Sequence, residues 1–75
     1  MSIDPVVVRL VSSFLAMQES ACTGRYDDAG ATVTARGFPP EHPAFAEEVE
    51  HEEDHWSHIG NQWATLRTSW EIANT

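Results

Sequence analysis

The sequence predicts an all-α fold, a helical hairpin in which an N-terminal helix packs against a long C-terminal helix. Apolar residues recur at steps of four and three in two long segments, and a stretch rich in glycine and proline separates these segments. Such steps bring side chains to one face of an α-helix. A chain of 75 residues buries little surface alone, so we expect a single domain that oligomerisation completes.

The first helix is predicted over about residues 4–22. Asp4 can cap its N-terminus, and Pro5 suits the first helical position. Gly24 is placed to end the helix. The apolar face is broad, which is typical of a helix that faces a core. Its apolar positions are Ile3, Val7, Leu10, Phe14, Met17 and Ala21, widened by Val8, Val11 and Leu15.

Residues 25–42 are predicted to form a short helix or a loop. A helix from about Asp27 to Arg36 would end at Gly37 and the two prolines that follow Phe38. The alternative is a short strand over the stretch ATVTA, which alternates and contains β-branched residues. The backbone of a lone strand could pair only with the same strand of another copy, so we favour the helix.

A long helix is predicted over about residues 43–73, either continuous or hinged near Gly60–Asn61. Its apolar series keeps the steps of four and three, and only Glu52 interrupts it. We call the series up to its last tryptophan the Trp stripe, which consists of Phe45, Val49, Trp56, Ile59, Trp63, Leu66 and Trp70; Ala73 continues it.

The Trp stripe is the predicted interface. At the rise of an α-helix, the long helix would measure about 45 Å and the first helix about 28 Å. The long helix would then overhang its neighbour and expose aromatic side chains, which normally marks an interface. A homodimer with four helices is the simplest arrangement. The alternative is that the middle segment folds back and covers the stripe.

Residues 47–58, EEVEHEEDHWSH, carry a dense group of acids and histidines. At about 100° per residue, one helix face would hold Glu48, His51, His55 and His58. Glu52 falls within the Trp stripe instead. The acidic face lies on the side of the helix opposite the Trp stripe and consists of Glu47, Glu50, Glu53 and Asp54.

Metal binding is the alternative interpretation of this stretch. Three histidines at this spacing could hold zinc, with Glu48 as a further ligand. Glu48 with His51, and Glu52 with His55, each match the Glu-x-x-His element of di-iron or manganese bundles, which would need an oligomer. The zinc-peptidase signature in HEEDH is disfavoured, because a peptidase also needs a third ligand and a cleft. We favour a chain without a cofactor.

Glu52 itself has two interpretations. It is either buried in the seam and paired with an arginine of a neighbouring helix, such as Arg9 or Arg67, or exposed beyond the packed region. A buried polar residue at one core position can fix helix register and oligomeric state.

Charge and composition limit the classes of molecule that the protein could bind. Twelve acids against four arginines give a net charge of −8, which disfavours direct binding of nucleic acid and suits a basic protein. The first residues lack the basic character of a secretory signal, and no apolar run approaches the length of a membrane span. We therefore expect a cytoplasmic protein without membrane contact, in which the single cysteine, Cys22, is reduced.

These features predict a small, acidic, non-catalytic protein-interaction module. It would dock through the Trp stripe or the acidic face. An inhibitor of a basic, nucleic-acid-handling complex fits the size and charge, and so does an accessory subunit of a larger enzyme. The alternative function is a metal-binding helical oligomer with zinc, iron or manganese.

Overall fold

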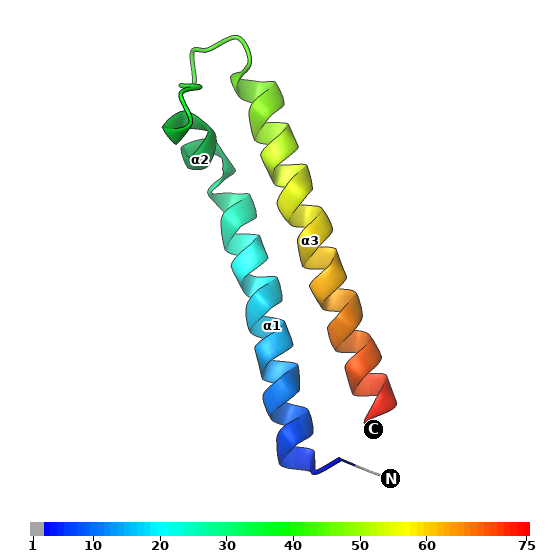
Figure 1. Cartoon of the computed structure of the whole chain (residues 1–75). Helices are drawn as coiled ribbons and strands as arrows, with labels where there is room; N and C mark the ends of the chain where they lie inside the picture. Colours follow the sequence, from blue (N-terminus) through cyan, green and yellow to red (C-terminus); the bar gives the residue numbers. More distant parts are fainter. Residues whose placement is uncertain (1–2) are drawn as a thin grey trace.

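The computed structural model describes residues 3–75 and confirms the all-α prediction over that range. Helix α1 spans Pro5–Asp27, α2 spans Ala29–Ala35 and α3 spans Phe45–Ala73. The stretch ATVTA lies in α2, so the preference for a helix over a strand is confirmed. Helices α1 and α2 run in one direction and α3 returns beside them, with both chain ends at the same end of the hairpin (Figure 1). The rod that results measures 57 × 15 × 12 Å.

Helix α1 begins as predicted but ends later. The Asp4 carboxylate accepts a hydrogen bond from the Val6 amide at 2.7 Å, and Pro5 opens the helix. At the other end the helix continues through Gly24 to Asp27, past the predicted end near residue 22. The Asp28 amide donates to the Gly24 carbonyl at 3.0 Å, so the helical bonding pattern persists there. Burial of Cys22 against α3 holds this turn in place, and that contact outweighs the weak helix propensity of glycine.

Replacing Gly24 with Ala should therefore raise the free energy of unfolding by about 0.5–1 kcal/mol. A Cβ built at this position meets no atom within 4 Å, so only the backbone entropy of the unfolded chain changes. Gly37→Ala is the matched control. Because Gly37 has φ +104°, the same change there should lower the free energy of unfolding. Urea unfolding monitored by circular dichroism measures both; an unchanged midpoint for Gly24→Ala would contradict the prediction.

Helix α2 ends in a glycine turn that also positions a charged side chain. The Phe38 amide donates to the Val33 carbonyl at 3.2 Å, and the Gly37 amide donates to the Thr34 carbonyl at 3.1 Å. This pair of bonds is the Schellman motif, in which glycine supplies the left-handed conformation. Arg36, the C-cap residue, is thereby fixed at the side of α2 that faces α3.

Helix α3 is continuous, and Gly60 does not break it. A Cβ built at Gly60 would lie 3.4 Å from the Cβ of Cys22 on α1. The glycine thus allows the two long helices to approach closely at mid-height of the hairpin.

The expected overhang of the long helix is wrong. Helix α1 is longer than predicted, and α2 continues in the same direction, so α3 has a neighbouring helix along most of its length (Figure 1). The middle segment folds onto α3, as in the alternative interpretation. Among the described residues, the buried apolar side chains are few: Leu15, Cys22, Ala29 and Val33. In the range that the structure covers, no helix combines the length and apolar character that crossing a bilayer requires.

Candidate interaction site

Most of the Trp stripe contributes to packing within the chain. The indole N–H of Trp70 donates to the Val8 carbonyl of α1 at 3.1 Å. Trp63 meets the ring of Phe14 edge-on, with ring centroids 6.4 Å apart. The three tryptophans are half-buried between the helices, as are Phe45, Val49 and Ile59, whereas Leu66 is 51% exposed. Contact of the whole stripe with a partner stays a prediction.

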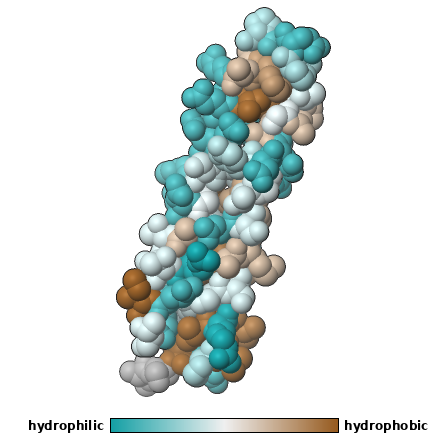
Figure 2. All heavy atoms as spheres, turned by 180° about the vertical axis from the view of Figure 1, so that it is seen from behind, coloured by the Kyte–Doolittle hydropathy of each residue, from teal (hydrophilic) through white to brown (hydrophobic). Residues whose placement is uncertain are grey.

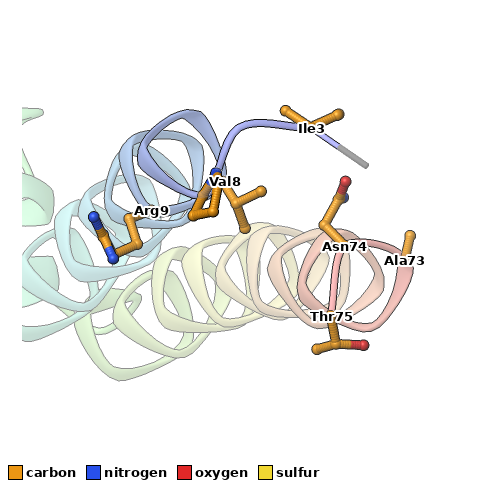
Figure 3. A pocket seen from close by; sticks show the side chains of 7 residues that line it. Ile3, Val8, Arg9, Ala73, Asn74 and Thr75 are labelled. Atoms are coloured by element: carbon orange, nitrogen blue, oxygen red, sulfur yellow. The ribbon is translucent and has the colours of Figure 1, made fainter. Parts of the chain in front are cut away.

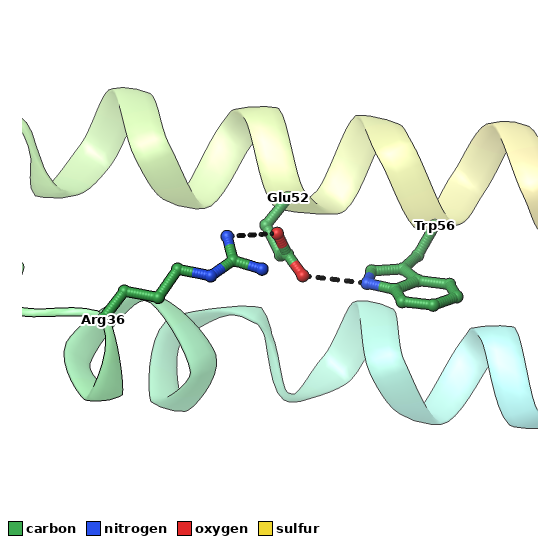
Figure 4. A network of polar contacts seen from close by, with 3 residues as sticks. All are labelled: Arg36, Glu52 and Trp56. Atoms are coloured by element: carbon green, nitrogen blue, oxygen red, sulfur yellow. Dashed lines mark hydrogen bonds and ion pairs between the residues drawn. The ribbon is translucent and has the colours of Figure 1, made fainter.

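Glu52 is buried, as one of its two interpretations expected, but its partner is neither Arg9 nor Arg67. The Nη1 atom of Arg36 lies 2.8 Å from one carboxylate oxygen, and the Trp56 indole N–H donates to the other at 2.9 Å (Figure 4). Arg67 instead pairs with Glu19 across the helices at 3.0 Å. The sequence did not point to Arg36 as the partner of Glu52, because the position of Arg36 depends on the glycine turn after α2.

The Glu52 carboxylate is held in its ionised form. The hydrogen bond from Trp56 lowers its pKa below the ordinary value of 4.5, and the hydrogen bond and charge of Arg36 lower it further. Burial acts in the opposite direction, but it is the weaker effect. The network satisfies a buried charge and fixes α2 on α3, so its role is structural.

This shift predicts a loss of stability in acid. A group whose pKa is lowered on folding stabilises the fold above its unfolded pKa, and the contribution disappears as the pH falls through the folded pKa. Glu52→Gln should be less stable than the wild type at about pH 6, and the difference should shrink below about pH 4. Thermal unfolding across this pH range measures it. Glu50→Gln, at an exposed position of the same helix, is the control and should keep the wild-type pH profile.

The predicted metal ligands do not all converge. Glu48, His51 and His55 line a shallow pocket of about 310 Å³ beside Glu52. His55 packs edge-on against Trp56, and His58 lies farther along α3 with its Nε2 atom 3.3 Å from the amide of Gln62. Between residues 3 and 75, no group of three or more histidine, cysteine or acidic side chains is arranged to hold a metal ion. Zinc, iron or manganese binding stays a hypothesis that requires ligands from another copy.

The acidic face lies at the α2 end of the hairpin. Glu47, Glu50 and Asp54 are exposed, and Glu53 is half-buried. Nine of the twelve acids in the sequence lie between residues 27 and 54, whereas residues 55–70 contain none. One end of the rod is therefore strongly acidic, and the other is nearly free of net charge.

A second apolar surface, which the sequence did not separate from the core, lies on α1. We call it the α1 stripe, and it consists of Val7, Leu10, Phe14 and Met17. These side chains are 42%, 65%, 54% and 65% exposed, because Leu15 is the α1 side chain in this region that is buried against α3. Phe14 touches α3 through its edge-on contact with Trp63. Figure 2 shows apolar surface near the end of the hairpin where the termini lie, and a separate apolar patch near the opposite end.

No protein-family model, curated protein or solved structure matches this chain.

Leu66 of α3 extends the α1 stripe. The Arg67–Glu19 ion pair marks one edge of the seam between the helices. At about 100° per residue, Leu66 and Arg67 lie on opposite sides of Trp63 around α3. In the same way, Phe14 and Glu19 lie on opposite sides of Leu15 around α1. Leu66 and Phe14 therefore lie along the same, opposite edge of the seam, and the apolar surface spans both helices.

A hollow of about 620 Å³ lies at the open end of the hairpin, between the start of α1 and the end of α3 (Figure 3). Apolar groups of Ile3 and Val8 line it together with Arg9 and the last three residues of the chain. The Asn74 amide donates to the Trp70 carbonyl at 2.7 Å and so ties the end of α3 in place. This hollow has a mixed lining, unlike the α1 stripe, which is apolar throughout.

Proposed function

We propose that the chain is a small, acidic, non-catalytic protein-interaction module that binds by helix packing on the α1 stripe and Leu66. The observation that carries this proposal is the exposure of four large apolar side chains at steps of three, four and three on one helix. Such spacing produces a straight apolar strip, which is the pattern that a partner helix recognises.

The size of the strip supports this function. Each exposed apolar side chain presents on the order of 100 Å², so the stripe with Leu66 presents about 400–500 Å². Patches of this size on a small protein commonly mark interaction sites. Charged residues are few on this part of α1, because Arg9 and Glu19 are the only ones between Pro5 and Gly24.

The acidic end supports a basic protein as a further partner. With the α1 stripe at one end of the rod, the acids of α3 stay accessible at the other. This separation suits an inhibitor of a basic, nucleic-acid-handling complex, and it also suits an accessory subunit that links two proteins. The same charge disfavours direct contact with nucleic acid.

Affinity capture from cells that produce the chain tests the proposal with three baits: the wild type, the double variant Leu10→Ser/Met17→Ser, and Ile72→Ser. Ile72 is 70% exposed on the far side of α3, so it controls for the loss of an exposed apolar group. We expect a bound protein, either another copy or a different chain, that the double variant loses and Ile72→Ser retains. Equal capture by all three baits would reject the α1 stripe as the binding site. Circular dichroism must show that all three baits keep their helices.

A further inference from the structure

We propose that the α1 stripe pairs with the α1 stripe of a second copy, with the two α1 helices antiparallel. This inference rests on the proposed function and names the partner. The self-matching register of the stripe, its area and the position of the charges all favour a second copy as the partner.

The register of the stripe suits antiparallel self-pairing. A twofold axis that crosses the stripe midway between Leu10 and Phe14 places Leu10 opposite Phe14 of the second copy, and Val7 opposite Met17 of the second copy. Every member of the stripe then faces another member, and none is left over. A twofold axis requires such self-complementarity, in which each contact occurs twice.

The position of Leu66 agrees with this axis. Trp63 contacts Phe14, and Trp70 contacts Val8, so Leu66, between the two tryptophans on α3, lies level with the middle of the stripe. It lies on the edge of the seam that carries the stripe. The two copies of Leu66 would therefore flank the axis from opposite sides and complete a four-helix arrangement.

The area is sufficient for a small dimer. The two stripes with both copies of Leu66 would bury about 800–1,000 Å² of apolar surface, and the flanking atoms of both α1 helices add to this. A specific interface needs about 1,000 Å² in total. The apolar share is high, as it is in interfaces between permanent subunits.

The distribution of charge favours the antiparallel orientation of the two α1 helices. Each copy carries nine of its twelve acids between residues 27 and 54, at the α2 end. Parallel pairing would place these two acidic ends side by side, where like charges repel. Antiparallel pairing points them in opposite directions along rods 57 Å in length, well beyond the Debye length of about 8–10 Å.

Sedimentation equilibrium tests the pairing. We expect the wild type to show twice the 8.4 kDa mass of one chain at micromolar concentration. Leu10→Glu and Met17→Glu should each raise the dissociation constant of the dimer on the order of a hundredfold or more, because each places two unpaired charges in the apolar contact. Ile72→Glu should leave it unchanged. A wild type that stays monomeric to millimolar concentration would overturn the inference, and so would a dimer that survives Leu10→Glu.

Cross-linking tests the orientation. Val7→Cys and Met17→Cys chains, each also carrying Cys22→Ala, are mixed and treated with a short bismaleimide. Antiparallel pairing gives mainly the mixed product, which links position 7 to position 17, and its mass identifies it. Linkage of 7 to 7 and 17 to 17 would show parallel pairing and overturn the inference.

The two proposals fail in different ways. A monomeric wild type that still captures another protein through the α1 stripe overturns only the dimer. A wild type that neither self-associates nor captures any protein through the stripe overturns both the dimer and the interaction function.

Discussion

Trp63→Ala should lower the free energy of unfolding by about 3 kcal/mol. The indole lies half-buried at the middle of the α1–α3 seam and meets Phe14 edge-on. A chain of 75 residues has a total stability of only about 4–11 kcal/mol, so this loss removes a large part of it. Urea unfolding monitored by far-ultraviolet circular dichroism measures the change directly.

Trp63→Phe is the matched control. Phenylalanine keeps most of the apolar volume and an aromatic edge toward Phe14, so it should lose about 1 kcal/mol or less. If Trp63→Ala and Trp63→Phe unfold at the same urea concentration as the wild type, the indole does not hold the hairpin together in solution.

Leu15→Ala should have an effect of similar size, about 2–4 kcal/mol. Leu15 is 5% exposed and faces α3 from the centre of α1. Few other large apolar side chains in the described part of the chain are as deeply buried, so the variant removes a large share of the buried apolar contact. Differential scanning calorimetry should show a melting temperature lower by roughly 10 °C or more.

Leu10→Ala makes the same chemical change five residues earlier on the same helix, at a position that is 65% exposed. At a protein concentration too low for self-association, it should change stability by less than about 1 kcal/mol. An equal loss for the two variants would mean that the face of α1 that contacts α3 has been assigned wrongly. The comparison therefore tests the orientation of α1 as well as the size of the core.

The sequence was sufficient to predict the helices, because two long apolar series and a glycine–proline stretch left few alternatives. Periodicity did not reveal which part of the broad α1 face packs against α3. The series through Leu10 and Phe14 was as regular as the one through Val8 and Leu15. The burial of Leu15, the close approach at Gly60 and the bond from Trp70 to Val8 show that the latter series packs against α3. Helical periodicity places side chains on a face, but the partner helix determines which of them are buried.

The site was predicted less completely for a related reason. The burial of Glu52 was weighed from its place in the Trp stripe, but its pairing with Arg36 depends on a left-handed glycine and a turn that bring the end of α2 back onto α3. Sixteen residues separate the pair, and periodicity within one helix carries no information about such a contact. The concentration of acids at one end was visible in the sequence, and its distance from the α1 stripe became clear only with the hairpin.

The hydrogen bond from Trp70 to Val8 joins residues that are 62 positions apart, whereas Arg36 and Glu52 are 16 apart. Bringing distant segments together costs more loop entropy, and contacts between them form later on average. We therefore expect contacts to form first where α2 meets the beginning of α3, and then in order along α1 and α3 toward the termini. Substitutions near Val33 should then slow folding, while substitutions at Trp70 should chiefly accelerate unfolding.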